Sequence, residues 1–366
     1  MDELVIIRSA AELAELRDEW TALIERCPGY YLSQTYLWAQ TAWETVAEPR
    51  GRELACLALR SAGGLVAIWP LVVQRERKLG IVRPLSFEGS EYSLPLVEPG
   101  HSARHRVGEL WQAVRSVADL ALLPQVRADS ILQSVLRKKA HWRALYGVED
   151  APFVRRAAHK DWEAYRQTLS SKLRNEINRG WRRLQALGEV CAQVVCRSEV
   201  AALVDWMLDR KKQWMAQRNA WNDWVGTETY RNFLQALLTR ENSTGRALLF
   251  VLKVNGTPVA VSFTSIDRTR LEGHIAAYDA DWQRCSPGNV LTEYIVGWAF
   301  ERGLDVDFRI GNESYKRRWM GQSSETATWL VATGVRGMPR VTRLVARLLL
   351  NRAKQRLAPS REPSAS

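Results

Sequence analysis

The sequence predicts a mixed α/β fold that is built twice in tandem, and two repeated patterns carry this prediction. Apolar runs on either side of a short turn indicate one β-hairpin over residues 53–73 and a second around Asn255-Gly256. Asn-Gly between two apolar runs is the strongest short-range signal of a hairpin. Strands follow each hairpin and helices flank it, so both halves share one order of elements. The helices are expected at 10–26, 35–46, 103–122, 161–187, 200–218 and 290–302, and the strands after the hairpins at 82–87, 92–97 and 270–278.

The boundary between the two halves is expected within residues 147–160, where the sequence has no long low-complexity linker. We therefore expect an N-terminal half at 1–150 on the acceptor side, a C-terminal half at 151–335, and a basic helix and tail at 336–366. A chain of 366 residues is long enough for two such units with a substantial core.

Composition narrows the class of protein. Hydrophobic residues make up 46% and charged residues 25%, which are globular values and exclude disordered and fibrous classes. No apolar run approaches the ~20 residues of a membrane span. The acidic start MDELVIIRSAAELAEL lacks the features of a signal peptide, and the five cysteines form no CxxC pair. A cytoplasmic location follows as the expectation.

The net charge of +12 is placed unevenly. Residues 331–366 hold eight arginines and lysines against Glu362 alone, a balance of +7, so residues 1–330 carry only +5. The apolar residues of the expected helix 341–357 recur at helical spacing, which fits either a helix docked on the body or one lying on an anionic membrane surface over 336–357. The 16 tryptophans are scattered through both halves, which favours packing over base stacking.

Residues 278–319 are the most informative segment. Ser286-Pro287-Gly288 directly precedes an amphipathic helix that stops at Gly303, and a strand at 304–310 leads through a glycine into Tyr315-Lys316. Proline suits the first helical turn, and glycine lets the backbone approach a ligand closely. A helix N-terminus of this kind presents free N–H groups to an anion. The sequence therefore predicts an anion site, and a pyrophosphate such as that of coenzyme A is the expected anion.

Several segments together resemble a known family. They are SKLRNEINRGWRRLQALG at 171–188, VNGTPVAVSF at 254–263, YDADWQRCSPGNVL at 278–291 and DFRIGNESYKRRW at 307–319, with SQTYLWAQTAW, IWPLV and EYSLPLVEPG in the first half. In these segments the chain resembles the CelD/BcsL-type GNAT acyltransferases that are associated with exopolysaccharide and cellulose biosynthesis. That family has two GNAT units and is related to the Fem-type aminoacyl transferases of peptidoglycan.

The resemblance implies a cytoplasmic transferase that moves an acyl group from acetyl-CoA or a longer acyl-CoA to an amine, without a metal. It places pantetheine along residues 275–278 and pyrophosphate at 283–290. The implied cofactor-binding residues are Tyr278, Gln283, Arg284, Ser286, Pro287, Gly288, Asn289 and Val290. The loop QRCSPGN departs from the usual GNAT pattern Q/R-x-x-G-x-G/A, which leaves the acyl carrier open. Fem-type relatives use aminoacyl-tRNA, the one case in which we expect a nucleic-acid partner.

Acyl transfer to an amine needs a proton acceptor for the amine, a proton donor for the leaving thiolate and donors to the oxyanion. Tyr315 stands where GNAT proteins often have their acid, although it could instead anchor its segment to Trp319. Lys316 could neutralise a phosphate or the oxyanion, or be solvated. Asp307 in an apolar strand is either a proton acceptor or a cap for neighbouring N–H groups.

His274 alternates with Glu272, Ala276 and Tyr278, so one strand face is expected to carry all four. Its imidazole could be the base, or simply a satisfied histidine of the sheet. In the first half, Glu88, Glu91 and Tyr92 are the candidates to line an acceptor groove, with solvated loop carboxylates as the alternative. The helix that begins at Ser171 is basic, which fits a solvated face or phosphate contacts.

We therefore expect an N-acyltransferase that acts on an amino sugar, or on another small-molecule precursor of an exopolysaccharide or envelope glycan. A Fem-type transferase that uses charged tRNA is one alternative. A degenerate GNAT protein that serves as a scaffold in a polysaccharide synthesis complex is another.

Overall fold

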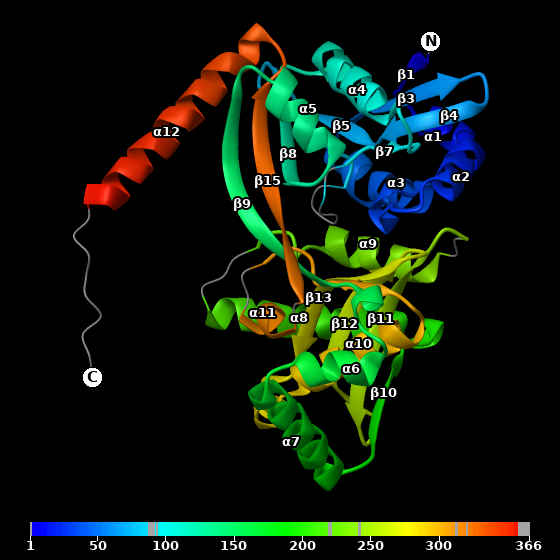
Figure 1. Ribbon diagram of the computed structural model, residues 1–366, viewed down its shortest axis with the longest axis vertical. Coiled ribbons are helices and arrows are strands. Elements are labelled where there is room, and N and C mark those ends of the chain that lie inside the picture. The colour runs from blue at the N-terminus through cyan, green and yellow to red at the C-terminus, as the bar shows by residue number, and fades with distance from the viewer. Residues whose placement is uncertain are drawn as a thin grey trace.

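The computed structural model describes residues 2–86, 92, 94–218, 222–240, 243–311, 314–319 and 321–357. Figure 1 shows two α/β units, one above the other, which are joined by two long strands. The N-terminal unit holds α1 (Ala10–Glu15), α2 (Arg17–Arg26), α3 (Tyr36–Ala42), α4 (Ala103–Val117) and α5 (Ile131–Lys139). The C-terminal unit holds α6 (Trp162–Thr168), α7 (Ser171–Leu187), α8 (Val200–Gln217), α9 (Glu228–Thr239), α10 (Pro287–Glu301) and α11 (Ser314–Trp319).

A small antiparallel sheet belongs to the N-terminal unit alone. Its order is β1 (Glu3–Ile7), β3 (Cys56–Ser61), β4 (Gly64–Trp69) and β7 (Leu96–Val97). The expected first hairpin is present as β3 and β4. Pro70 ends β4 because proline cannot donate to the ladder, and the chain continues as β5 (Leu71–Glu76) in a different sheet.

A second sheet runs through both units and has eleven strands among the described residues, in the order β10-β11-β12-β13-β14-β9-β15-β8-β6-β5-β2. Besides β5, its strands are β2 (Glu53–Leu54), β6 (Leu79–Pro84), β8 (Leu120–Arg127), β9 (Arg143–Val154), β10 (Val190–Val194), β11 (Arg246–Val254), β12 (Thr257–Ile266), β13 (Arg270–Tyr278), β14 (Asp305–Asp307) and β15 (Gln322–Ala332).

The long strands β9 and β15 join the units. β15 pairs with β8 of the N-terminal unit along one edge and with β9 along the other, and the end of β9 pairs with β14 of the C-terminal unit. The expected boundary at residue 150 therefore falls inside a strand. Because the backbone ladder is continuous, the two units are held in one orientation.

The same crossover occurs in each unit. β6 and β8 are parallel and connected through α4, while β13 and β14 are parallel and connected through α10. Each crossover follows antiparallel strands, which matches the repeated order of elements that the sequence predicts. The tandem mixed α/β fold is confirmed.

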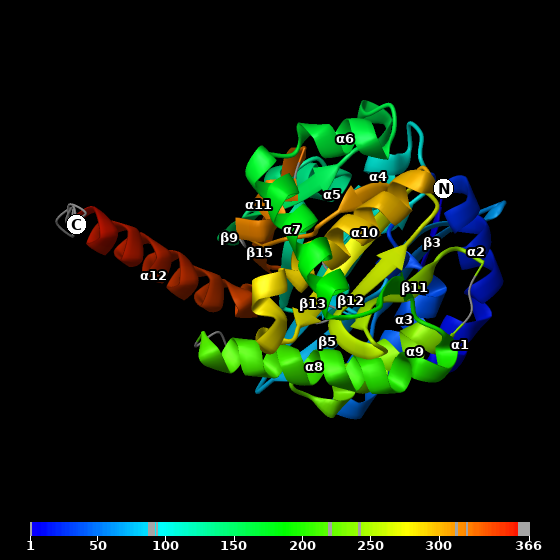
Figure 2. The same cartoon turned by 90° about the horizontal axis from the view of Figure 1, so that it is seen from below.

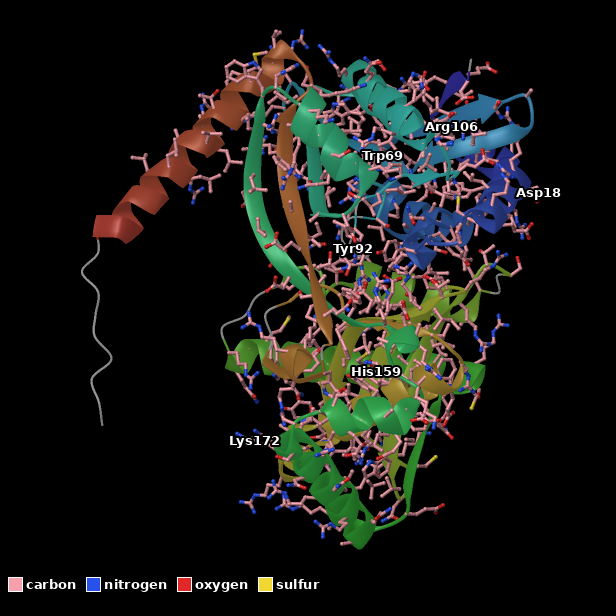
Figure 3. The ribbon with its side chains drawn as sticks, viewed as in Figure 1. Asp18, Trp69, Tyr92, Arg106, His159 and Lys172 are labelled. Carbon is pink, nitrogen blue, oxygen red and sulfur yellow. The ribbon has the colours of Figure 1, made fainter. Side chains whose placement is uncertain are left out.

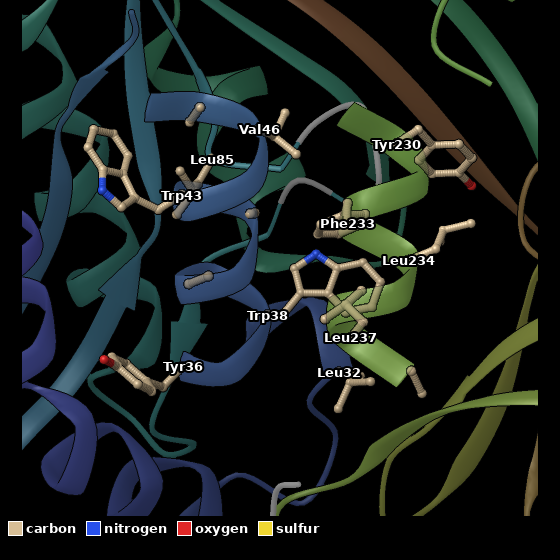
Figure 4. Packing of buried hydrophobic residues seen from close by; sticks show 14 of the residues in the cluster. Leu32, Tyr36, Trp38, Trp43, Val46, Leu85, Tyr230, Phe233, Leu234 and Leu237 are labelled. Carbon is tan, nitrogen blue, oxygen red and sulfur yellow. The ribbon is translucent and has the colours of Figure 1, made fainter. Parts of the chain in front are cut away.

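The seam between the units is part of the hydrophobic core. Figure 4 shows α3 of the first unit against α9 of the second, with Trp38 and Phe233 between them. These two rings lie 5.3 Å apart at their centroids, and Trp38 is fully buried. Buried aromatic pairs of this kind stabilise an interface beyond the area that they remove from water.

Several expected elements differ in their bounds; the helix expected at 103–122, for example, ends at Val117, and residues 120–122 belong to β8. Two of the differences bear on the site. The helix expected at 161–187 is divided into α6 and α7, because Asp161 and Ser170 each cap a separate helix start with a side-chain oxygen. The strand expected at 304–310 ends at Asp307, since Arg309 adopts a left-handed backbone conformation with φ of 57°. The segment after Asp307 is therefore free to turn away from the sheet.

The final helix α12 (Met338–Leu357) begins against β9 and β15. Val341 is buried there, with Leu344 and Val345 partly buried beside it. Figures 1 and 2 show that the remainder of α12 leaves the body of the molecule. Among the described residues, no helix combines the length and apolar character that crossing a membrane requires.

Candidate active site

An opening between two parallel strands marks the candidate site. β13 and β14 pair at Arg270 with Asp305, Leu271 with Val306 and Glu272 with Asp307, and there β14 ends. β13 continues to Tyr278 and pairs only with β12 over this stretch of the described residues. Its other edge keeps backbone N–H and C=O groups that an extended ligand can pair with.

A β-bulge lies in this opening. Phe263 pairs with Ile275 and Thr264 with Gly273, which leaves His274 as the extra residue of β13. The His274 ring stacks on Trp38 at 5.5 Å, whereas Tyr278 packs with the core under α10. The expected common face of His274 and Tyr278 is therefore wrong, because a bulge breaks the alternation of the strand.

His274 is held between a cation and a hydroxyl group. The Arg309 guanidinium donates to Nδ1, so the proton of the neutral ring is on Nε2, which donates to Ser265 Oγ at 2.7 Å. The Ser265 hydroxyl in turn donates to Glu272 at 3.1 Å. Burial and the Arg309 charge hold the pKa of His274 well below its usual value. The imidazole is therefore neutral, with both nitrogens engaged.

Glu272 is 2% exposed and lies beside Asp307 in the strand register. Burial raises the pKa of Glu272 to about 7, against the opposing charge of Arg309 and with a further rise from Asp307. A carboxyl group with this pKa can take up or release a proton near neutrality.

Asp307 connects the two units. The Tyr92 hydroxyl donates to its carboxylate at 2.9 Å, and the backbone N–H of Arg309 donates at 2.7 Å. Arg127 of β8 lies 3.9 Å from the same carboxylate. Figure 3 places Tyr92 at the level where the two units meet. The N-terminal unit thus contributes Tyr92 and Arg127 to a polar cluster whose carboxylate belongs to the C-terminal unit.

The predicted anion loop lies beyond the far end of β13. Ser286 has φ of 50°, and Pro287 is the first residue of α10. Helix α7 lies directly on this loop: a Cβ at Gly180 would be 2.6 Å from the carbonyl oxygen of Cys285 and 2.8 Å from Val290. Only glycine allows this approach, so Gly180 fixes α7 against the start of α10.

A carboxylate from α7 sits at the start of α10. Glu176 accepts hydrogen bonds of 2.6 Å from the Asn289 amide and of 2.6 Å from Arg318 of α11. Burial alone would raise the pKa of Glu176, but Arg318, together with Asn289 and Ser286, lowers it below its usual value. An internal anion is therefore present where the sequence predicts a ligand's phosphate.

The remaining predicted residues are distributed around this arrangement. Tyr315 is 39% exposed on α11, while Lys316 is buried and donates to the carbonyl of Ile310. Gln283 and Arg284 are exposed on the loop. Glu88 and Glu91 lie outside the described residues. The structure thus joins Tyr92, Asp307 and His274 into one network.

Several members of that network were not predicted from the sequence, namely Arg127, Ser265, Glu272 and Arg309. Glu272 could have been found from the sequence. It lies two residues before His274 in a strand that contacts the core, and a buried carboxylate needs a hydrogen-bonding or charged partner. Arg127 carries no such signal in the sequence, since only the tertiary fold brings it to Asp307.

Comparison with known proteins gives a family for part of the chain. Residues 171–317 match the profile of the acetyltransferase (GNAT) domain. Most of the C-terminal unit is therefore similar to a GNAT acyltransferase domain. The acyltransferase class expected from the sequence is confirmed, and the match does not distinguish the exopolysaccharide-associated family. Among curated protein sequences, none matches the chain.

Solved structures share the fold over nearly the whole chain. FemX superposes with a TM-score of 0.60 at 12% identity, covering 91% of this chain and 96% of its own. A conserved protein of unknown function from Bacteroides thetaiotaomicron gives 0.55 at 14%, covering 89% and 100%. The C-terminal domain of an Agrobacterium fabrum protein described as a lysylphosphatidylglycerol synthetase gives 0.54 at 14%, covering 92% and 96%.

Proposed function

We propose that the chain transfers an acyl group from an acyl-CoA thioester, acetyl-CoA or a longer one, to an amine in the opening between β13 and β14. The observation that carries this proposal is the continuity of the unpaired edge of β13 with the start of α10. A pantetheine arm can pair along that edge while its pyrophosphate meets the backbone N–H groups around Ser286 and Gly288.

Acyl transfer forms one bond and breaks another. The amine nitrogen bonds to the thioester carbon, the C–S bond breaks, the amine proton is taken up and the thiolate is protonated. We assign proton uptake to Asp307 with Tyr92, at the end of β14 where the strands part. Tyr315, exposed on α11, is the proposed donor to the thiolate, and Lys316 holds the backbone turn between them.

For the acceptor, we propose an amino group on a sugar precursor of an exopolysaccharide or envelope glycan. Two observations support an acceptor that lies between the units: Tyr92 comes from the N-terminal unit, and Asp307 comes from the C-terminal unit. Residues from both units would then surround the amine, and the rest of the acceptor would lie along the seam.

The donor is tested by calorimetry with acetyl-CoA and longer acyl-CoAs, and by thiol release with glucosamine as the acceptor probe. We expect binding by the wild-type chain and loss of binding in Gly288→Val, because a Cβ at Gly288 already lies 3.4 Å from the Tyr278 ring. Absence of binding by the wild type to every acyl-CoA would refute the donor assignment.

One observation favours a second candidate, a Fem-type transfer from aminoacyl-tRNA. Glu176 occupies the start of α10, and the exposed residues Lys172, Arg179 and Arg182 make α7 basic. Glu176→Gln separates the two donors. If coenzyme A binds, removal of this carboxylate should tighten binding severalfold, because the pyrophosphate no longer competes with it. If tRNA is the donor, acyl-CoA binding stays absent and RNA binding falls steeply with added salt.

Helix α12 bears on where the protein acts, whether it is a transferase or the scaffold that is the remaining candidate. We propose contact of 336–357 with an anionic membrane, since Leu349 and Leu350 are 59% and 63% exposed on a basic helix. Co-sedimentation with phosphatidylglycerol vesicles, but not with phosphatidylcholine vesicles, is expected and should be lost in L349S/L350S.

The scaffold role is tested by replacing Asp307 and Lys316 together with alanine. A scaffold would keep its cellular phenotype in this variant.

A further inference from the structure

A large groove lies along the seam between the units, apart from the opening at β13. Its cavity volume is about 990 Å³, and its walls are α2, the segment from β10 to α8, the end of α9 and the start of β11. A hollow of about 490 Å³ shares Arg17, Arg197 and Arg240 with it and extends it to Tyr36 and Gln40 of α3. The two hollows form one groove, which we call the seam groove.

Four arginines from separate elements line the seam groove: Arg17, Arg197, Arg240 and Arg246. Arg240 is paired with Glu44 of the N-terminal unit and donates to Thr41 at 3.0 Å. Within the described part of the chain, Arg17, Arg197 and Arg246 are exposed and form no ion pair. Asp18 and Glu25 of α2 line the same groove, so its lining holds four arginines against two carboxylates. The arginines remain in excess, and an anion bound among them offsets their mutual repulsion.

The remaining lining indicates the kind of anion. Guanidinium groups pair with phosphate and carboxylate oxygens in a bidentate manner, which favours these two groups. The volume is at the upper end of small-molecule sites and exceeds what one inorganic phosphate fills. Apolar side chains such as Val194, Val195 and Leu238 form part of the wall, so an uncharged portion of the ligand has surface to contact.

The seam groove is separate from the predicted donor loop. Arg246 begins β11 and pairs with Ile266, close to the start of β13, whereas α10 follows the other end of β13. The eight residue steps of β13 correspond to about 26 Å of extended chain. One ligand phosphate therefore cannot occupy both places.

Helix α3 lies between the seam groove and the buried network. Tyr36 and Gln40 face the groove, while Trp38 on the same helix stacks on His274 at 5.5 Å. A ligand in the groove would therefore contact the element that packs against the β-bulge.

We propose that the seam groove is a second ligand site, which binds a small molecule carrying a phosphate or carboxylate group between Arg17, Arg197, Arg240 and Arg246. This site does not depend on the identity of the acyl donor. Its occupant is an anionic metabolite larger than a free phosphate, with the charged end at the arginines and an uncharged part against the apolar wall.

The test is isothermal titration of the full chain with inorganic pyrophosphate and with citrate, at 50 and 150 mM salt. Pyrophosphate probes a phosphate-binding site, and citrate probes a carboxylate-binding site. We expect one or both to bind, and R197S/R246S to weaken binding at least about tenfold, because each lost charge-assisted contact is worth roughly one decade. Unchanged thermal unfolding of the variant establishes that it is folded.

Two control variants make the result decisive. R179S/R182S removes two exposed arginines of α7 outside the groove and should leave binding unchanged; an equal loss there would mean that net charge alone attracts the probe. Gly288→Val alters the donor loop and should also leave binding of the probes in the seam groove unchanged. Loss of pyrophosphate binding in Gly288→Val but not in R197S/R246S, or no binding of either probe by the wild type, would overturn the proposal.

Discussion

The two crossovers of the molecule share a topology and differ in the connection between strand and helix. In the C-terminal unit, residues 279–286 alone separate β13 from α10, and most of them form one 3₁₀ helix, Ala280–Cys285, that leads into the N-terminus of α10. In the N-terminal unit, residues 85–102 separate β6 from α4, and part of that connection forms β7 in the small sheet. The longer connection carries Tyr92, which reaches Asp307 of the other unit. One copy thus keeps a short strand-to-helix connection, where we propose the anion site, and the corresponding segment of the other copy completes the neighbour's polar cluster.

Asp307→Asn should have the largest effect, because it removes the carboxylate that both units approach. Loss of a positioned proton acceptor typically lowers the rate by about 10²–10⁴-fold. We expect kcat/KM for the acyl-CoA reaction to fall by about a thousandfold, with the melting temperature little changed because asparagine can still accept from Tyr92. Retention of near wild-type activity would place the chemistry elsewhere.

Glu272→Gln tests the buried carboxyl group through stability. Since burial raises the pKa of Glu272 to about 7, the folded state binds a proton that the unfolded state has released, and wild-type stability falls as pH rises from about 5 to 8. A shift of this size corresponds to roughly 3 kcal/mol of pH-dependent unfolding free energy.

Urea denaturation at pH 5 and pH 8 measures this difference. The variant should lose most of the decline between the two pH values, whereas Glu15→Gln on an exposed turn of α1 should retain it. An identical decline in Glu272→Gln would show that other groups cause the pH dependence.

Tyr92→Phe tests whether the first unit contributes to the site of the second. Removing a hydrogen bond to a buried carboxylate costs about 1.5–3 kcal/mol, so we expect kcat to fall by about tenfold or more. Tyr31→Phe is the matched control, since the Tyr31 ring packs 5.0 Å from Tyr92. If Tyr92→Phe reduces stability alone and leaves kcat unchanged, the contact between units is only structural.

Gly180→Ala should have the smallest effect, confined to the anion loop. The added methyl group meets the carbonyl oxygen of Cys285 and must displace α7, at a cost of about 1–3 kcal/mol in overpacking. We expect a lower melting temperature and a raised KM for the acyl-CoA donor. Gly147→Ala in β9, where nothing lies within 4 Å of the added Cβ, should leave KM unchanged.

The elements that could be predicted from the sequence are those marked by a short local motif, such as a turn or a helix start. Asn255-Gly256, the paired apolar runs and Ser286-Pro287 each specify their own turn, so hairpins and helix starts were predictable. The strands β8, β9 and β15 were not predicted, because their pairing joins segments more than 150 residues apart. The bulge at His274 was likewise hidden, because nothing in an alternating strand marks which residue is extra.

Only some of the residues that were predicted as catalytic from their chemical type lie close together in the structure. Asp307, His274 and Tyr92 meet, although Asp307 ends β14, His274 lies at the bulge inside β13 and Tyr92 lies between β6 and β7. Tyr315 was expected to follow directly from a strand, but that strand ends early at Asp307, and Tyr315 lies on a short helix instead. The positive φ of Arg309, which causes this change, depends on contacts that a sequence does not display.

The position of β15 has a consequence for how the protein is made. This strand is the last of the large sheet to be synthesised, yet it lies between β9 and β8 in the middle of the sheet. A nascent chain that has released only the first 320 residues has no central strand to join its halves, and the edges of β8 and β9 are exposed meanwhile. Completion of the sheet therefore waits until residues 322–332 have been synthesised, and until then its unpaired strand edges are prone to aggregation.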